Sequence, residues 1–289
     1  MKQFDVVVVG SANLDLVATL DHLPVPGETQ IALDYAEHAG GKGLNQAVAC
    51  ARMGARTAFV GCVGSDDAGT FLRGVLEREG IDVSLLRTVA SPTGRAFINV
   101  DQHGENEIVV VSGANAEVTP TELPKSAVVL LQLEIPLSTV VATLQAARTR
   151  GTTTVLNPAP ARTLDAGLLS LVDVAVPNEN EARLLGGRDH LLALGVRNVV
   201  TTLGERGAEV ADLNGVELVP PHAVQPIDTV GAGDAFTGAM CAMLAGGSDV
   251  HESVRVGAVA GALATTKHGA VPSLPTRRDV ESALGGSLR

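Results

Sequence analysis

In its second half, the 289-residue chain alternates short apolar runs with helical segments, and this alternation restricts the fold more than any other feature of the sequence. The apolar runs have the length of buried strands. We expect strands at 127–133, 152–156, 174–176 and 199–202, a strand pair at 208–212 and 216–219, and helices at 138–150, 168–171, 235–244, 251–266 and 277–283. Strands that alternate with helices predict an α/β fold with a mostly parallel central sheet flanked by helices.

Strands of two kinds are expected in the first half of the chain. Apolar runs at 4–9 and 57–61 resemble buried parallel strands, and helices are expected at 45–53 and 69–79. Four other runs, at 14–20, 30–38, 96–101 and 107–111, are less uniformly apolar and look half exposed. Such strands do not suit the buried middle of a parallel sheet, so we expect them to form a small separate β-sheet that covers a cleft as a lid. Because no repeat or linker divides the chain, residues 1–289 are expected to form one domain.

Composition limits the partners and the compartment. Hydrophobic residues make up 45% of the chain, which fits an ordered enzyme. A net charge of −11 argues against nucleic acid or an anionic membrane surface as the main partner. No apolar run reaches the length of a membrane span or a signal peptide, so we expect a cytoplasmic protein. Cys50, Cys62 and Cys241 lie in apolar segments without metal-type spacing and are expected to be buried thiols in a reducing compartment.

The segment 228–234 is the main candidate for chemistry. Gly231 and Gly233 flank Ala232, so backbone N–H groups can turn toward a ligand just before the helix expected at 235–244. A helix N-terminus with free N–H groups suits an anion. A carboxylate beside such an anion site, Asp234, is repelled by a resting phosphate and fits a proton acceptor for a hydroxyl that attacks a phosphoryl group. The alternative is a glycine-rich helix start with Asp234 as a cap.

A second glycine-rich segment, Gly40-Gly41-Lys42-Gly43-Leu44-Asn45, precedes the helix expected at 45–53. Its glycines let the backbone approach a ligand, and Lys42 and Asn45 offer donors to hydroxyls or phosphate. A flexible turn is the plainer interpretation. Asn13 and Asp15 follow the first strand, at the edge of the sheet where ligands bind in open α/β folds, and together they can bind vicinal hydroxyls. They could equally be turn residues.

Three further groups follow strands. Asn178 and Glu181 would lie on one side of a starting helix, where they can order phosphate oxygens and hydrated Mg²⁺, form a capping box, or do both. Residues 202–207 contain two glycines and fit either a nucleotide loop or a turn. Glu134 stands at the end of the strand expected at 127–133, where an exposed acid would be unremarkable.

Taken together, these segments resemble the ribokinase branch of the PfkB carbohydrate kinase family. Asp228-Thr229-Val230-Gly231-Ala232-Gly233-Asp234 is similar to the C-terminal signature of the family, and Gly40-Gly41-Lys42-Gly43-Leu44-Asn45-Gln46-Ala47 to its N-terminal signature. Residues 113–116, 157–161 and 177–181 also resemble this branch, in the same order. The resemblance extends from about Val6 to Pro275. It implies ATP-dependent phosphorylation of a sugar hydroxyl, which in this branch is the 5-hydroxyl of D-ribose.

The resemblance also implies roles for individual residues. Asp234 would be the base, and the N–H groups of Gly231, Ala232 and Gly233 would hold the transferring phosphoryl group. The positions that match sugar-binding residues are Asn13, Asp15, Gly41, Lys42, Gly43, Asn45 and Glu134. Those on the nucleotide side are Asn178, Thr202, Leu203, Gly204, Glu205, Arg206, Gly207 and Gly233, with Glu181 near Mg²⁺. A monovalent ion, usually K⁺, would be held by Asp228, Val230, Ala264, Lys267, Gly269 and Ser273, mostly through main-chain oxygens.

Two departures from the family pattern stand out. The segment between Glu181 and Val199 is short, so a helix usually present there is expected to be trimmed. Ala258 stands where many relatives place Asn or His against the adenine, which leaves the base contacts open. Neither departure touches the groups implied in phosphoryl transfer.

The substrate prediction rests on the polar groups that converge on the sugar side. They suit a compact polyol with neighbouring hydroxyls, and we expect D-ribose to be preferred over 2-deoxyribose, with Asp15 as the residue most responsible. The alternatives are a kinase of the same fold for deoxyribose, a ketohexose phosphate or a nucleoside, and a non-catalytic sugar-binding regulator. The small lid would need a partner surface, so a homodimer through the lid is expected.

Overall fold

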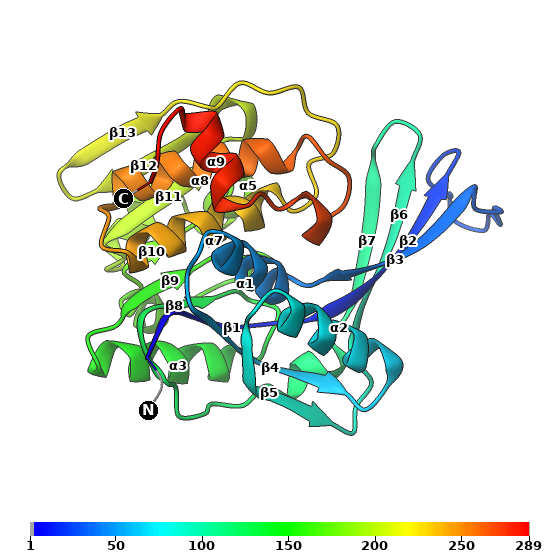
Figure 1. The fold of residues 1–289 in the computed structure, drawn as a ribbon, viewed down its shortest axis with the longest axis horizontal. Coiled ribbons are helices and arrows are strands. Elements are labelled where there is room, and N and C mark those ends of the chain that lie inside the picture. Colours follow the sequence, from blue (N-terminus) through cyan, green and yellow to red (C-terminus); the bar gives the residue numbers. More distant parts are fainter. Residues whose placement is uncertain (1–2, 289) are drawn as a thin grey trace.

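The computed structural model describes residues 3–288, and its centre is one large β-sheet (Figure 1). Nine strands lie in the order β13-β12-β11-β10-β9-β8-β1-β4-β5. They are β1 Gln3–Val9, β4 Thr57–Gly64, β5 Asp82–Val89, β8 Lys125–Leu131, β9 Thr153–Leu156, β10 Val174–Ala175, β11 Asn198–Thr202, β12 Ala208–Asp212 and β13 Gly215–Val219. All neighbours from β11 to β5 are parallel, and β12 and β13 add an antiparallel pair at one edge. The α/β fold with a mostly parallel sheet is confirmed.

Helices cover both faces of this sheet because its strands are apolar on both sides. In β1, Val6 and Val8 point into one core layer and Val7 and Val9 into the other, and all four are buried. The first layer packs against α1 Lys42–Arg52, α2 Asp67–Arg78, α7 Ala232–Ala245 and α8 Val250–Ala264. The second packs against α3 Leu137–Thr149, α4 Ala166–Leu169 and α6 Arg188–Ala193, beside α5 Glu179–Leu184. Helix α9, Arg277–Leu284, packs on α8.

The half-exposed strands form a second, four-stranded sheet in the order β3-β2-β6-β7. Their bounds are β2 Asn13–Leu20, β3 Asp34–Gly40, β6 Gly94–Asp101 and β7 Asn106–Val111. This sheet projects from the body as a twisted ribbon (Figure 1). Its edge strand β7 is exposed along its whole length, including Ile108, Val109, Val110 and Val111. The prediction of a small separate sheet is confirmed.

Several predicted boundaries were wrong. Residues 30–33 lie outside β3, which instead runs on to Gly40 because Gly40 and Asn13 are paired across the two strands. Glu134 does not end a strand, since β8 stops at Leu131. Strand β5 was not predicted at all. Helices α1 and α7 begin three residues earlier than expected, at Lys42 and Ala232, so both glycine-rich segments run into the first turn of a helix.

Three further predictions concern the ends of the chain, membrane helices and the cysteines. Met1, Lys2 and Arg289, which the one-domain prediction included, lie outside the described residues. No helix within residues 3–288 is long and apolar enough to span a bilayer. All three cysteines are buried, as predicted.

Candidate active site

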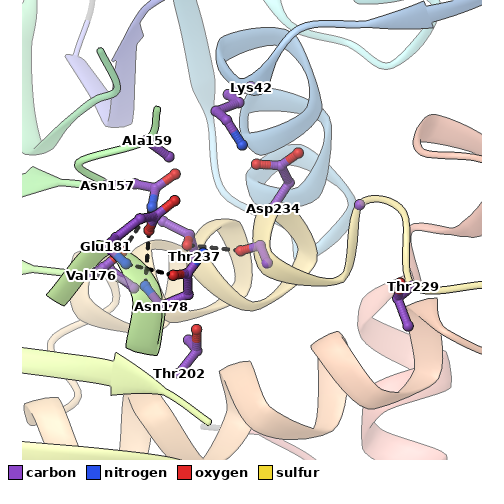
Figure 2. A pocket seen from close by; sticks show the side chains of 12 residues that line it. Lys42, Asn157, Ala159, Val176, Asn178, Glu181, Thr202, Thr229, Asp234 and Thr237 are labelled. Atoms are coloured by element: carbon purple, nitrogen blue, oxygen red, sulfur yellow. Dashed lines mark hydrogen bonds between the residues drawn. The ribbon is translucent and has the colours of Figure 1, made fainter. Parts of the chain in front are cut away.

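A cleft opens where the chain leaves the carboxyl ends of the parallel strands, which is the usual ligand position in open α/β sheets. Strands β9, β10 and β11 lead into its wall, and α1 and α7 present their first turns to it (Figure 2). The residues that line it are Lys42, Asn157, Ala159, Val176, Asn178, Glu181, Thr202, Thr229, Gly231, Gly233, Asp234 and Thr237. Both glycine-rich segments singled out in the sequence therefore meet in one place.

Asp234 lies in the first turn of α7, and its carboxylate is held by two amide groups. Asn45 donates from Nδ2 to Oδ2 over 2.9 Å, and Gln46 donates from Nε2 to Oδ1 over 2.8 Å. The side chain is largely buried, yet it lines the cleft, and Figure 2 shows Lys42 directed toward it. A carboxylate that is fixed in direction and open to the cleft on one side can accept a proton from a bound hydroxyl.

The anion site predicted beside Asp234 would lie at the N-terminus of α7. Gly231 is the N-cap of α7 and has a positive φ of 79°, which favours glycine there. In the described part of the chain, the N–H groups of Gly231 and Gly233 reach no acceptor, whereas that of Ala232 donates to Thr229 O at 3.2 Å. Two of the three predicted donors are thus free for an anion, and the third is engaged in the turn.

Lys42 is surrounded by carboxylates. Burial disfavours its ammonium form, but the nearby charges of Asp234, Glu134 and Glu181 outweigh that effect, so the pKa of Lys42 is raised. Its backbone N–H donates to Glu134 Oε2 at 3.1 Å, and the Ser11 hydroxyl donates to the same oxygen. Glu134 is thereby fixed against the start of α1, and the site keeps one cation among several acids.

The glycines of the second segment give room to other parts of the protein. A Cβ at Gly40 would lie 2.0 Å from Asp15 Oδ2, one at Gly41 2.8 Å from Asn13 N, and one at Gly43 2.5 Å from Ser11 N. The segment from Ser11 to Asp15 therefore packs directly on this loop. The predicted sugar-side residues are brought together by that contact, although among them only Lys42 lines the cleft described above.

Asp15 is the most perturbed acid of the site. Burial and the nearby charges of Glu134 and Asp234 raise its pKa from 3.8 to about 7. Asn13, beside it in β2, is buried, and its Oδ1 accepts a hydrogen bond of 2.7 Å from Asn115 Nδ2. Asn115 also binds Ala12 through both the N–H and the carbonyl group, so it fixes the direction of the Asn13 amide.

On the opposite wall, Asn178 and Glu181 form a capping box at the start of α5. Glu181 N donates to Asn178 Oδ1 and Asn178 N to Glu181 Oε2, each over 2.8 Å. Both side chains also line the cleft, so the two interpretations left open for them are compatible. Burial is the main reason that the pKa of Glu181 is raised, with Asp234 adding to it and the Asn178 hydrogen bond and Lys42 opposing it.

The predicted nucleotide loop is divided between two places. Thr202 lines the cleft. Leu203 and Arg206 instead line a shallower hollow together with residues of α5 and α6, where Arg206 pairs with Glu179 and Arg188 with Glu209. Among the described residues, Gly204, Glu205 and Gly207 line neither. Helix α6 is only six residues long, which agrees with the trimmed segment expected here.

The two loops predicted to hold a monovalent ion lie side by side. Asp228 Oδ2 accepts from Gly269 N at 2.8 Å and Oδ1 from Val230 N at 2.9 Å, while Asp228 N donates to Thr265 O at 3.1 Å. These bonds tie the loop before Gly231 to the chain that follows α8, which contains Lys267, Gly269 and Ser273, while Ala264 is the last residue of α8 itself. Within residues 3–288, no group of three or more His, Cys, Asp or Glu side chains is placed to hold a metal ion.

Sequence reasoning missed the amides that support the site. Gln46 and Gln132 are completely buried, and Asn157 bonds to Gln46, but none was assigned a role. A signal was present for two of them. Gln132 is the only polar residue of the apolar run 127–133, and Gln46 directly follows Asn45 and precedes the apolar run 47–51.

Asn45 holds Asp234, a role that the sequence did not suggest. It was predicted as a donor to hydroxyls or phosphate, but its Nδ2 donates to Asp234. One N–H of this amide is used by Asp234, which leaves the second N–H to donate, and Asn45 Oδ1 has no partner among residues 3–288, so Asn45 can offer a hydroxyl both a donor and an acceptor.

Comparisons with known proteins agree with this geometry. The model of the pfkB family carbohydrate kinases matches residues 3–277. Ribokinase from Haemophilus influenzae is 40% identical, with 94% of this chain and 95% of that protein covered. Deoxyribokinase from Salmonella typhi is 32% identical, with 94% and 96% covered. The solved structure of ribokinase from Arabidopsis thaliana complexed with ribose and ATP has a TM-score of 0.88 and 32% identity, and covers 98% of this chain and 99% of that one.

Proposed function

Because the chain belongs to the pfkB family of carbohydrate kinases, we propose that it transfers the γ-phosphoryl group of ATP to the 5-hydroxyl of D-ribose. The observation that carries this proposal is the buried carboxylate of Asp234, held by Asn45 and Gln46 at the N-terminus of α7. A protein that only bound a sugar would have no need of a proton acceptor beside an anion site. This argument disfavours the non-catalytic regulator.

The proposed reaction follows from these groups. Asp234 accepts the proton of the 5-hydroxyl as the oxygen forms its bond to the γ-phosphorus, and the bond from that phosphorus to the oxygen bridging to the β-phosphate breaks, which releases ADP. The N–H groups of Gly231 and Gly233 would stabilise the charge on the transferring phosphoryl oxygens. Lys42, across the cleft from Asp234, would add a positive charge on the sugar side.

For the nucleotide and ions, we propose the following positions. Asn178, Glu181 and Thr202 would contact ATP and Mg²⁺, and one Glu181 oxygen is not used by the capping box, which suits an ion held by one carboxylate together with phosphates. Mg²⁺ would supply charge neutralisation at the phosphates. K⁺ would be held by main-chain oxygens of the loops around Asp228 and Gly269 and would stiffen the chain before Gly231; hard oxygen donors suit it.

The sugar would be held by Asn13, Asp15 and Glu134, with the backbone around Gly41 and Gly43, and Asn45. Each side chain is already fixed by protein hydrogen bonds or close packing, so a substrate lacking a matching hydroxyl would leave a buried polar group unpaired. This favours ribose over 2-deoxyribose. A nucleoside is disfavoured because its base would need an apolar or aromatic shelf, and the chain has only five Phe, one Tyr and no Trp.

We also propose that the chain is a homodimer joined through the lid. The four-stranded sheet is small, and Phe97, Ile108, Val109 and Val111 are about half exposed on it. A sheet of this size with apolar residues on its surface gains stability when a second copy covers it. An isologous pair would bury the same face of both lids.

The test is ADP release with a panel of sugars, followed by identification of the phosphorylated position by ³¹P NMR. D-Ribose should be the best substrate and D-ribose 5-phosphate the product. Asp234→Asn should lower kcat by about 10²- to 10⁴-fold while ribose binding, measured by calorimetry, is retained. Faster turnover of 2-deoxyribose, adenosine or fructose 1-phosphate would refute the substrate, and near-normal kcat in the folded Asp234→Asn protein would refute the base.

A further inference from the structure

We infer that Gln46 is a positioning residue for Asp234 and that Gln132 donates to the Gln46 oxygen in a way that matches the amide direction set by Asp234. The inference rests on the proposed function, because it concerns the same proton acceptor. It assigns a role to two side chains that lie behind Asp234 and do not line the cleft.

The observation is a continuous row of hydrogen bonds that joins four side chains from distant parts of the chain. Gln132, one residue after β8, donates from Nε2 to Gln46 Oε1 over 2.6 Å. Gln46, in α1, donates from Nε2 to Asp234 Oδ1 over 2.8 Å, and from the same nitrogen to Asn157 Oδ1 over 2.9 Å. Both glutamines have an exposed fraction of 0%, so water cannot replace either partner.

The direction of each amide in this row follows from the charge at its end. An ionised Asp234 can only accept, so Gln46 must present its NH₂ group to it. The Oε1 of Gln46 then faces Gln132, which must also present its NH₂ group. The Oε1 of Gln132 then faces Gly10, where a Cβ would lie only 2.2 Å from it.

The common direction of the two amides is what supports a role in positioning, since Gln132 donates to Gln46 and Gln46 donates to Asp234. A row that served only to join α1 to the end of β8 would not need both NH₂ groups to point toward one carboxylate. The arrangement instead satisfies the carboxylate first. Asn45 holds the second oxygen of Asp234, so Asn45 and Gln46 together fix the plane of the carboxylate.

This plane matters because a general base must meet the proton with the correct geometry, and a displacement of about 1 Å can lower the rate by about 100-fold. Lys42, Asp15 and Glu181 interact with Asp234 through charge, but within residues 3–288 none of them forms a hydrogen bond with it that would set a direction. Gln46 is therefore expected to affect turnover rather than sugar affinity.

The first experiment compares Gln46→Met, which keeps the volume but removes the hydrogen bonds, with Cys50→Ala as a matched control. Cys50 lies one turn further along α1, is buried, and bonds to Gly238 O of α7, so it reports on α1–α7 packing away from Asp234. For Gln46→Met we expect kcat to fall about 10- to 100-fold and the Kd for ribose, from calorimetry, to stay within about 2-fold. Cys50→Ala should change neither by more than about 3-fold.

The second experiment tests the direction of the amide. Gln132→Glu places an acceptor where a donor is needed, so the Gln46 amide is driven to turn its oxygen toward Asp234. Gln132→Met removes the hydrogen bond without that reversal, and Asp234 continues to orient Gln46. We expect a loss in kcat of at least about 10-fold for Gln132→Glu and of no more than about 3-fold for Gln132→Met.

Three results would overturn the inference. They are an unchanged kcat in Gln46→Met, a parallel loss of kcat and ribose affinity in that variant, and equal losses for the two Gln132 substitutions. If Gln132→Glu does not fold, Gln46→Met decides the matter alone. A wild-type protein without ribose phosphorylation would refute the proposed function instead, so the two failures are distinguishable.

Discussion

Replacing Asp15 by Asn should stabilise the protein at alkaline pH and weaken its sugar binding. Asp15 is packed against Gly40, and burial together with the charges of Glu134 and Asp234 raises its pKa from 3.8 to about 7. Asn has nearly the same shape and no charge. The substitution therefore removes an ionisation that the folded protein opposes, without creating a cavity.

The sign and size follow from proton linkage. Below pH 3.8, Asp15 is protonated in both the folded and the unfolded state and has no effect on stability. Between pH 3.8 and about 7 the folded state keeps the proton that the unfolded state has lost, so the free energy of unfolding falls as pH rises. Each pKa unit corresponds to about 1.4 kcal/mol. Asp15 therefore lowers the free energy of unfolding by at most about 4 kcal/mol above pH 7, and about 3 kcal/mol of this loss develops between pH 5 and pH 8.

The assay is urea unfolding of wild type and Asp15→Asn at several pH values from 5 to 8. The free energy of unfolding of the variant minus that of the wild type should increase with pH. Taking this difference cancels the contributions of all groups that the two proteins share. Glu77→Gln, which removes an exposed carboxylate on α2 away from the lid and the cleft, is the control and should give a constant difference. A constant difference for Asp15→Asn as well would refute the reasoning. The same variant should bind ribose at least about 10-fold more weakly, because the ionised carboxylate can accept from two hydroxyls and the amide oxygen replaces only part of this.

Three other predictions concern the ion, the sugar and the lid. Activity should be higher in K⁺ than in tetramethylammonium at equal ionic strength with little change in ribose affinity, and equal rates would exclude a functional ion site at Asp228. Asn115→Ala should raise the Kd for ribose about 10-fold and change kcat by less than about 3-fold, because Asn115 holds the Asn13 amide; an unchanged Kd would contradict this role. Sedimentation should show a dimer at micromolar concentration. Ile108 and Val109 lie on opposite faces of β7, so of the variants Ile108→Lys and Val109→Lys only the one on the face that the dimer buries should be monomeric. A monomeric wild-type protein would contradict the proposal.

The fold could be predicted from the sequence because strands and helices alternate in a regular pattern that the hydrophobic residues reveal. The alternation of apolar runs and helices predicted the parallel sheet, and the uneven polarity of the four early runs separated the lid from it. Helix starts were less accessible. Lys42 and Asn45 were expected before or at the beginning of α1, but Gly41, with a φ of 88°, turns the chain so that the helix already begins at Lys42. A glycine cap of this kind has no side chain from which its position could be recognised.

Site residues could be predicted from the sequence where a residue type is unusual for its surroundings. Asp234 beside two glycines and Glu181 three residues after Asn178 could both be assigned candidate roles. The direction in which an amide points could not be predicted, since it depends on partners far away in the sequence. Gln46 and Asp234 are 188 residues apart, and Gln132 and Gln46 86.

The glycines of the second segment show why a correct motif can still carry an incomplete explanation. They were expected to let a ligand approach the backbone. In the structure, the positions that side chains would occupy at Gly40, Gly41 and Gly43 are already taken by Asp15, Asn13 and Ser11. A methyl group at Gly40 would displace the carboxylate proposed to select ribose, before any sugar had entered. The glycines are thus required first for the assembly of the sugar side from two distant segments, and any gain for a ligand depends on that assembly.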